Sequence, residues 1–446
     1  MAQPSQAVYG DKIMTVEPFS VEQVPQQERH GNSFSQFTLW LGSNLTIADY
    51  ALGFLPVSLG MSWIWAIIAI LIGNLIGALV VGLCSAMGPA YGLPQLIITR
   101  ITFGRVGGYL PGLLNFVSTI GWFTVNNILG SFGLHALIPG LSFTLASIIL
   151  VLVQGIVAML GHNFIHAYER TMSILLGIIF AIVTVISLVH WGTLSAYHPT
   201  HKQVGLSIMV IVAAAFSYLG SWGPYASDYS RYLRRDISKV RVGLAAATGS
   251  FLASVWLEIV GMFVAVFAAG HSANSIDALH STMGGFGAVA TIAIILGGTA
   301  ADAINLYSNS LSLRALDVNI PRWLIVVFAS LVGLILSLLG RGQFESNFDN
   351  FLLLIGYWIT PWMGVLFADF YVKNRRQATP SHVKHIHWPG LISFIVGIGV
   401  SVPFMNSTLY EGPIAIACHG LDLAFYIGFA VAFILYLALK RSPQLN

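Results

Sequence analysis

Nine residues, Ser217-Tyr218-Leu219-Gly220-Ser221-Trp222-Gly223-Pro224-Tyr225, interrupt an apolar segment that is otherwise long enough to cross a membrane. Gly220 and Gly223 are poor helix formers, and Pro224 cannot donate a hydrogen bond to the preceding turn. In hydrocarbon an unpaired backbone group is costly, so a helix breaks at this depth only beside a cavity or inside packed protein. A broken helix carrying an aromatic ring and a hydroxyl group is typical of a transporter substrate site at the membrane midplane.

Composition places the whole chain in a membrane. Of its 446 residues 56% are hydrophobic and 8% are charged, whereas a soluble protein has about 25% charged residues. About 20 apolar residues cross the hydrocarbon as a helix. We predict an all-α integral membrane protein with twelve transmembrane helices, in the windows 34–59, 63–87, 107–132, 142–161, 167–190, 206–226, 242–269, 283–313, 322–340, 347–372, 387–405 and 414–439.

The basic residues predict the orientation. If the N-terminus is cytoplasmic, alternate loops leave only Lys202 and Arg341 outside, so 18 of the 20 basic residues lie on one side. The positive-inside rule then favours both termini in the cytoplasm and insertion in the cell (inner or plasma) membrane. The polar tail 1–33 lacks the apolar region of a signal peptide. Two isolated cysteines, Cys84 and Cys418, form no metal-binding or disulfide pattern.

A second interruption lies in the first window. Gly42-Ser43-Asn44-Leu45-Thr46 places a glycine and three polar side chains at mid-membrane, and Asp49 follows. Alone, these residues could equally hydrogen-bond to neighbouring helices. However, the first and sixth windows hold corresponding positions in two groups of five. Two interrupted helices so placed indicate an inverted repeat with the binding site at its interface.

The third and eighth windows carry polar residues at helical spacing. Trp122 and Asn126 share one face of the third, and Thr299, Asp302 and Asn305 share one face of the eighth. Such faces are costly against lipid and must point inward. An Asn side chain offers one acceptor and two donors in a plane, which suits the edge of a heterocyclic amide, and tryptophans can stack on its ring.

Asp49, Glu258 and Asp302 are acids that fall well inside the predicted spans. Intramembrane carboxylates act by default as proton carriers or cation ligands. Asp302, on the inward polar face, is the strongest candidate for coupling. Asp49 is a candidate gating or structural residue. Glu258 has little polar company in sequence and could simply hydrogen-bond across helices.

Short matches along the chain resemble the nucleobase–cation symport family 1, the cytosine, purine, allantoin and hydantoin permeases, and in particular its purine–cytosine branch. The matches are Val24-Pro25 with Glu28-Arg29, Asn44 with Gly53, Gly121-Trp122 with Asn126, His166-Ala167-Tyr168-Glu169-Arg170, Ala226-Ser227-Asp228-Tyr229-Ser230-Arg231-Tyr232, and Asn305-Leu306-Tyr307-Ser308 with Leu311-Ser312. They occur in order and in the expected helices.

The resemblance implies a fold like that of the bacterial leucine transporter. Residues 34–190 and 206–372 would be inverted five-helix repeats, helices 11 and 12 in 387–439 would be peripheral, and the tails 1–33 and 440–446 would be cytoplasmic. It also implies a nucleobase between Trp122 and Trp222 with Asn126 as its in-plane partner, and a sodium site made by Thr299 and backbone near Ser43. Ala301-Asp302 and Ile304 depart from the fungal members and indicate proton coupling through Asp302.

The sequence therefore predicts a secondary active importer of a nucleobase or similar planar heterocycle, driven by proton or sodium symport. A vitamin-like heterocycle (a thiamine precursor or pyridoxine) or an allantoin-type ureide is the alternative substrate, and a channel or membrane sensor is the alternative class. No nucleophile–base constellation or phosphate loop predicts an enzyme, and no cofactor or nucleic-acid partner is expected. A monomer in the lipid bilayer is expected, although the sequence leaves the oligomeric state open.

The predicted site residues fall into three sets. The substrate set is Ser43, Asn44, Trp122, Asn126, Gly220, Ser221, Trp222 and Asn305; the coupling set is Thr46, Thr299 and Asp302; the gating or structural set is Asp49, Glu169 and Pro224. No metal is expected beyond a sodium ion at Thr299 and the backbone near Ser43.

Overall fold

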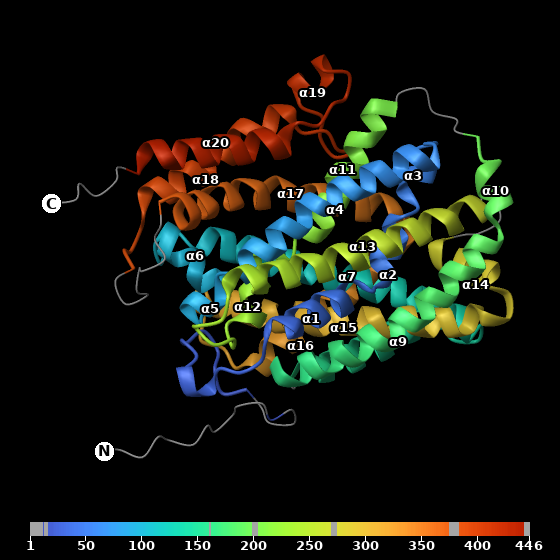
Figure 1. The fold of residues 1–446 in the computed structure, drawn as a ribbon, viewed down its shortest axis with the longest axis horizontal. Helices are drawn as coiled ribbons and strands as arrows, with labels where there is room; N and C mark the ends of the chain where they lie inside the picture. The colour runs from blue at the N-terminus through green and yellow to red at the C-terminus, as the bar shows by residue number, and fades with distance from the viewer. Residues whose placement is uncertain are drawn as a thin grey trace.

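The structure, a computed structural model, describes residue 12 and residues 17–159, 162–198, 204–268, 274–373 and 383–440. These residues form helices joined by loops, with one isolated β-bridge between Asn406 and Glu411. Most long helices run alongside one another, lengthwise in Figure 1, with α18 and α20 at one edge and α9 and α16 at the other.

The helices are α1 (Ser33–Asn44), α2 (Ile47–Leu52), α3 (Leu55–Ser58), α4 (Trp63–Ser85), α5 (Gly88–Tyr91), α6 (Gln95–Phe103), α7 (Tyr109–Leu137), α8 (Phe143–Met159), α9 (His162–Val189), α10 (Trp191–Ser195), α11 (Val204–Gly220), the 3₁₀ turn η2 (Gly223–Tyr225), α12 (Ala226–Ser230), α13 (Lys239–Phe267), α14 (Ser275–Thr282), α15 (Gly287–Arg314), α16 (Arg322–Gly340), α17 (Phe344–Phe367), the π-helical η5 (Ala368–Val372), α18 (Trp388–Ser401), α19 (Pro413–Ala417) and α20 (Ala424–Leu439). Several begin at side-chain caps: Ser238 accepts from the Arg241 amide before α13, and Asn274 accepts from two amides of α14.

Six helical segments of the described chain are long and apolar enough to cross a membrane, judged by length and composition. They are Trp63–Tyr91, Asn163–Val189, Val204–Ser230, Lys239–Phe267, Gly284–Arg314 and Arg322–Val372, the last of which contains both α16 and α17. The count of twelve crossings stays a prediction. The predicted window 414–439 is divided in the structure, because α19 ends at Ala417 and α20 starts at Ala424.

Helix packing divides most of the chain into two groups. The bundle group comprises α1, α2, α4, α11 and α13, in which α4 packs on α11 and α13 and α1 packs on α13. The scaffold group comprises α7, α8, α9, α15 and α16, in which α15 packs on α7, α8, α9 and α16. α17 packs on α11, α18 and α20, so these last helices lie outside the two groups.

The contacts follow a pattern of exchange. Each helix of the first half can be matched with one of the second half: α1 with α11, α4 with α13, α7 with α15, α8 with α16 and α9 with α17. Most contacts between two of these helices then have a counterpart between their matched helices. Thus α1–α13 becomes α11–α4, α1–α9 becomes α11–α17, and α7–α16 becomes α15–α8. Two five-helix repeats would produce this pattern, so it supports the predicted division at 34–190 and 206–372, which stays a prediction.

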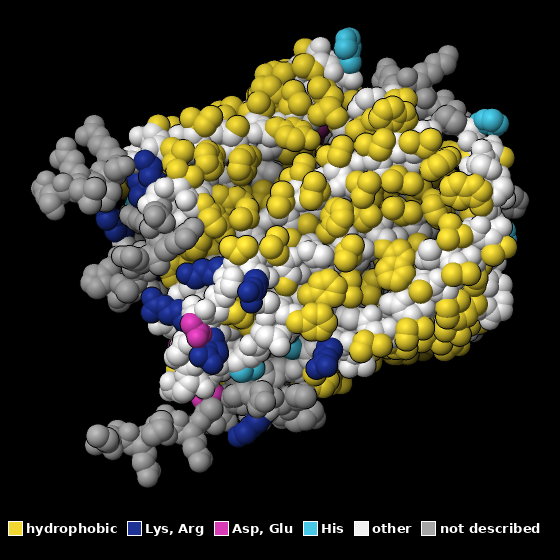
Figure 2. Space-filling model, viewed as in Figure 1, with side chains coloured by type: hydrophobic (Ala, Val, Ile, Leu, Met, Phe, Trp, Pro, Cys, Tyr) yellow, Lys and Arg dark blue, Asp and Glu magenta, His cyan; other side chains and the backbone are white. Residues whose placement is uncertain are grey.

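The surface separates charge from apolar side chains. Figure 2 shows one face on which hydrophobic side chains cover the middle and the right, while Lys and Arg gather at the left end. Exposed apolar residues are numerous on the long helices, for example Leu75 and Leu79 on α4 and Ile178 on α9. A protein in water would not expose so large an apolar surface, whereas lipid tails cover it at no cost.

Candidate functional site

The sixth predicted window is broken in the structure where the sequence indicates. α11 ends at Gly220, Ser221 and Trp222 form a turn, and η2 follows with Pro224 in its first turn. The Ser221 hydroxyl donates to the carbonyl of Tyr218 (2.6 Å), and the Ser221 amide still donates one turn back. The break therefore stays buried with its freed groups largely satisfied.

The first window is also broken. α1 ends at Asn44 and α2 begins at Ile47, with Thr46 accepting from the amide of Asp49 (3.4 Å) as the N-cap. The side chains of Ser43 and Asn44 each donate to the carbonyl one turn earlier, at 2.7 and 2.8 Å. All of these residues are buried.

The two breaks are joined by hydrogen bonds. The indole Nε1 of Trp222 donates to Asn44 Oδ1 at 2.9 Å, and the hydroxyls of Tyr218 and Thr46 lie 2.9 Å apart. The Trp222 ring also packs edge-on against Trp40, with centroids 5.5 Å apart. The structure thus brings together the two interrupted segments that the sequence singled out.

A polar cluster joins the third and eighth windows. Asp302 Oδ1 accepts from the side-chain amides of Asn126 on α7 (3.0 Å) and Asn305 one turn along α15 (3.4 Å). Asn305 in turn accepts from the Tyr225 hydroxyl of η2 (3.2 Å). Asp302 and both asparagines are at most 3% exposed. Because both amide NH₂ groups point at the carboxylate, Asn126 Oδ1 is left without a hydrogen-bond partner among the described residues.

Trp122 lies one turn before Asn126 in a cage of rings. Tyr218, Phe348 and Phe351 surround its indole edge-on, with centroids 5.1, 6.2 and 5.2 Å away. Its side chain is buried, with 5% exposed, and its Nε1 has no hydrogen-bond partner within the described chain. Buried polar groups normally have hydrogen-bond partners, so the Trp122 N–H and the Asn126 oxygen, one helical turn apart on α7, are two candidate contacts for a ligand.

α15, which carries the predicted sodium ligand Thr299, packs against the first break. Gly297 and Gly298 bring α15 against the first break: a Cβ on Gly297 would lie 2.4 Å from the carbonyl oxygen of Leu45. Thr299 follows directly, but its hydroxyl donates to the carbonyl of Ile295 in its own helix (2.9 Å). The part of the chain that the structure describes holds no cluster of three His, Cys, Asp or Glu suited to a metal ion.

The predicted gating or structural acids lie on other helices than the Asp302 cluster. Glu169, on α9, is buried against α1, where a Cβ on Gly42 would lie 2.6 Å from both its carbonyl and its carboxylate oxygen. Asp49, on α2, is also buried, and its carboxyl interacts with Glu258 of α13. The structure therefore gives Glu258 a polar partner that sequence spacing does not reveal.

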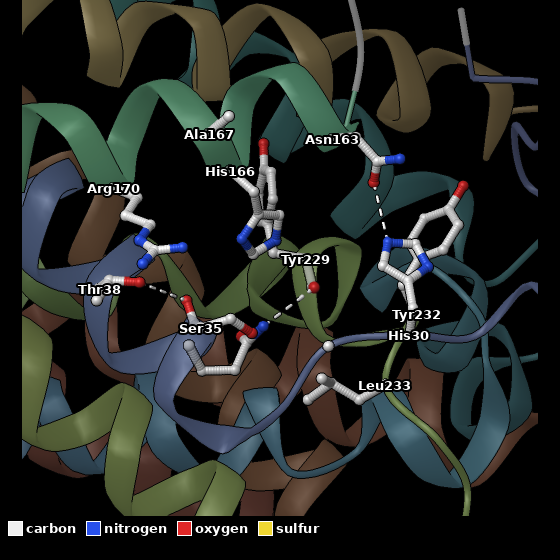
Figure 3. A pocket seen from close by; sticks show the side chains of 12 residues that line it. His30, Ser35, Thr38, Asn163, His166, Ala167, Arg170, Tyr229, Tyr232 and Leu233 are labelled. Carbon is white, nitrogen blue, oxygen red and sulfur yellow. Dashed lines mark hydrogen bonds between the residues drawn. The ribbon is translucent and has the colours of Figure 1, made fainter. Parts of the chain in front are cut away.

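A cavity of about 200 Å³ opens at the end of the bundle where α1 begins. Figure 3 shows His30, Asn163, His166, Arg170 and Tyr229 around it, with a hydrogen bond of 3.0 Å between His30 and Asn163. The ring of Tyr229 packs against Trp40 (6.1 Å), which packs against Trp222. Two aromatic side chains therefore separate this cavity from the paired breaks.

Sequence reasoning missed several residues of this region. Trp40 carries the ring contact between Trp222 and Tyr229, yet it stands in an ordinary apolar run. Tyr218 and Tyr225 lie within the interrupting stretch, which was a usable signal, but their partners Thr46 and Asn305 are far away in sequence.

Comparison with known proteins identifies the family. The model of a family of permeases for cytosine and purines, uracil, thiamine and allantoin matches residues 23–431. The chain belongs to this family. YxlA of Bacillus subtilis, a candidate purine-cytosine permease, is 30% identical to this permease over 97% of both chains.

Two fungal relatives are more distant. The purine-cytosine permease fcyB of Emericella nidulans is 27% identical and aligns over 96% of this permease and 89% of its own length. The vitamin B6 transporter of Saccharomyces cerevisiae is 26% identical, over 85% of this permease and 70% of its own length.

Solved structures agree on the fold. Mhp1, a nucleobase–cation symport family 1 transporter in a closed conformation with bromovinylhydantoin bound, superposes with a TM-score of 0.76 at 18% identity, over 95% of this permease and 94% of Mhp1. A Na⁺-coupled sialic acid symporter gives 0.64 at 14% identity, over 94% and 92%. The permease is thus a multi-pass membrane transporter with the fold of this group, and its family is one of permeases rather than enzymes.

Proposed function

We propose that the permease imports a nucleobase, cytosine or a purine, by symport with a proton or a sodium ion. The family description and the purine-cytosine permeases among its relatives support this substrate class. Mhp1, named for nucleobase–cation symport, supports coupling to a cation.

One observation carries the substrate assignment. Asp302 draws the NH₂ group of Asn126 toward itself, so Asn126 Oδ1 is free to accept from a ring N–H, while Trp122 Nε1 is free to donate. A planar ring with an N–H donor and a nearby acceptor satisfies both groups, and the indoles of Trp122 and Trp222 offer faces for stacking. Ser43, Asn44, Gly220, Ser221 and Asn305 complete the proposed site.

Transport would proceed by alternating access. Substrate would sit between the bundle and scaffold groups. Movement of one group against the other would open the cavity of Figure 3 as the inner exit once Tyr229 separates from α15, to whose Ile304 carbonyl its hydroxyl donates (3.0 Å). Thr46, Thr299 and Asp302 are the coupling candidates, with Pro224 and Glu169 structural. The Lys- and Arg-rich end in Figure 2 would face the cytoplasm, with both tails, 1–33 and 440–446, on that side.

Uptake of radiolabelled cytosine, adenine, guanine and hypoxanthine by expressing cells tests the proposal. We expect wild type to accumulate at least one base, and Asn126→Ala or Trp222→Ala to reduce its uptake roughly three- to tenfold, because a lost hydrogen bond or ring contact is worth about 0.5–1.5 kcal/mol. Replacing Na⁺ by choline, then adding a protonophore, identifies the ion.

Matched controls are available on the surface. Trp323→Ala on α16 and Asn347→Ala on α17 remove the same side-chain types at exposed positions and should leave uptake unchanged. If the wild type accumulates none of the four bases, the nucleobase assignment is wrong; if it does and both site variants match it, the site is wrong.

Pyridoxine is the second candidate substrate, because the vitamin B6 transporter of Saccharomyces cerevisiae is a relative. Competition of uptake by unlabelled pyridoxine, a thiamine precursor and allantoin separates this from a nucleobase. Unlabelled pyridoxine that outcompetes every base would favour it.

A further inference from the structure

Two carboxyl groups lie on the packed pair of helices α2 and α13 inside the bundle group. Asp49 on α2 and Glu258 on α13 are 0% and 1% exposed. Glycines bring the two backbones together: a Cβ on Gly53 would lie 2.1 Å from the carbonyl oxygen of Glu258, and one on Gly261 would lie 2.0 Å from that of Tyr50. Asp49 lies one turn before Gly53 on this contact face, so its side chain is turned toward Glu258.

The surroundings of the pair are polar but incompletely bonded. The hydroxyls of Ser254, one turn before Glu258, and of Tyr218 on α11 face the Asp49 carboxyl, and Asn74 on α4 faces Glu258. Nevertheless, neither oxygen of Asp49, nor Glu258 Oε1, nor Ser254 Oγ makes a hydrogen bond of ordinary geometry within the described chain. The charged group that acts on Asp49 is the Glu258 carboxyl itself.

Elementary electrostatics fixes what such a pair can hold. One ionised carboxylate inside a membrane protein is already expensive, and two adjacent ones repel strongly when water is absent. The pair therefore retains at least one proton, carried by one carboxyl and shared with the other. Gain or loss of that proton changes the charge of the bundle group by one unit at a fixed place.

Tyr218 connects this pair to the proposed substrate site. Its hydroxyl lies 2.9 Å from that of Thr46 at the first helix break and also faces Asp49. Its ring packs edge-on against Trp122, with centroids 5.1 Å apart. When the pair carries a negative charge, its attraction for the Tyr218 hydroxyl competes with Thr46, so the first break and the Trp122 ring both respond.

We propose that Asp49 and Glu258 form the binding site for the co-transported proton, and that Tyr218 relays its occupancy to the substrate site. This deepens the proposed function, on which it rests, by naming the coupling ion and its location. Asp302 then serves to orient amides rather than to carry the proton.

Infrared difference spectroscopy on purified full-length permease tests proton binding without any substrate. A pH jump in wild type should produce a protonated-carboxyl C=O band, and both Asp49→Asn and Glu258→Gln should remove or shift it, because one proton is shared. A band that either variant leaves unchanged would overturn the shared site. Size-exclusion profiles identify variants that fail to fold; for these, Ser254→Ala keeps both carboxyls and should shift the band, and an unshifted band would count against the site.

Proteoliposomes test coupling. With labelled hypoxanthine, or whichever base the wild type accumulates, both carboxyl variants and Tyr218→Phe should retain exchange across the membrane but lose at least tenfold in accumulation driven by a pH gradient. Accumulation equal to wild type, or accumulation driven by a Na⁺ gradient and abolished in these variants, overturns the proton assignment. A wild type that moves no base but shows the shared band would refute the proposed function while leaving the carboxyl site standing.

Discussion

Asp302 shows how one buried carboxylate can determine what its neighbours offer to a ligand. It accepts from two amides, Asn126 and Asn305, and within the described residues the oxygen of Asn126 and the Trp122 N–H one turn away have no hydrogen-bond partner. The orientation of Asn126, and hence the preference for an N–H donor, depends on this carboxylate.

Asp302→Asn is expected to weaken substrate binding. The new NH₂ group would face that of Asn126, so one amide must rotate and Asn126 Oδ1 turns away from the ring. Leaving a buried amide group without its partner costs about 1–3 kcal/mol, which predicts a KM raised roughly 5- to 100-fold in uptake assays. Retained exchange with an unchanged KM but lost accumulation would instead identify Asp302 as the proton carrier.

Helix breaks depend on what packs against them. The first break lies against α15, where Gly297 leaves room for the carbonyl of Leu45 and Gly298 meets Ile47. The second is held by Ser221 and Trp222, whose indole bonds to Asn44. The interruptions are therefore built into the packing of both groups.

Gly297→Ala and Gly298→Ala form a matched pair for testing this. A Cβ at Gly297 would lie 2.4 Å from Leu45 O, whereas one at Gly298 would lie at an ordinary 3.7 Å from Ile47 Cγ2. We expect Gly297→Ala to lower the thermal midpoint and uptake, since overpacking costs about 1–3 kcal/mol, and Gly298→Ala to resemble wild type. Equal effects of both would contradict a role for close packing at the break.

Hydrogen bonds and ion pairs join distant segments at the Lys- and Arg-rich end of the molecule. The loop after α15 turns at Asp317, whose φ of 60° is rare outside glycine, and its carboxylate accepts from Arg100 (2.9 Å), Arg105 (2.7 Å) and Tyr109. Glu17, in the segment before α1, accepts from Arg231, which directly follows α12, at 2.6 Å. These contacts link segments far apart in sequence.

Stability should depend on pH through Asp317. Partial desolvation raises the pKa of its carboxyl, but the hydrogen bonds from Arg105, Tyr109 and Arg100 outweigh this and hold it well below the ordinary value. A carboxyl whose pKa is lower in the folded than in the unfolded state stabilises the fold at pH values above its unfolded pKa, which is about 4. This stabilisation is lost progressively as the pH falls below that value. We expect Asp317→Asn, which tolerates the positive φ, to lower the thermal midpoint by about 1–3 °C at pH 7 and by less at pH 3.

Asp236→Asn is the control for this measurement. Asp236 pairs with Arg234 at 2.9 Å, but both side chains are about two-thirds exposed, so its loss should change the midpoint little at either pH. A difference between wild type and Asp317→Asn that is the same at pH 7 and pH 3 would contradict the role of the ionised carboxylate.

The sequence alone could predict the breaks, because Gly220, Pro224 and Gly42 are local signals. It could also group Asp302 with Asn305 by helical spacing. It could not pair Asp302 with Asn126 or Asp49 with Glu258, since those contacts depend on which helix faces pack together.

Other predicted roles depended on side-chain direction. Thr299 was expected to face a cation, yet its hydroxyl bonds back to its own helix, as Thr often does in apolar surroundings. The N-terminal tail was expected to be merely polar. In the structure Glu17 is buried with Arg231, a pairing that no local pattern announces.

The division of the proposed site between two helix groups has a consequence for inhibition. Asn44 and Trp222 belong to the bundle group, whereas Trp122, Asn126 and Asp302 belong to the scaffold group. A ligand that contacts both groups links two parts of the protein that must move relative to each other during transport. An analogue that grips both too firmly should therefore stall the carrier rather than be carried, so the tightest binders of this permease should be among its slowest cargoes.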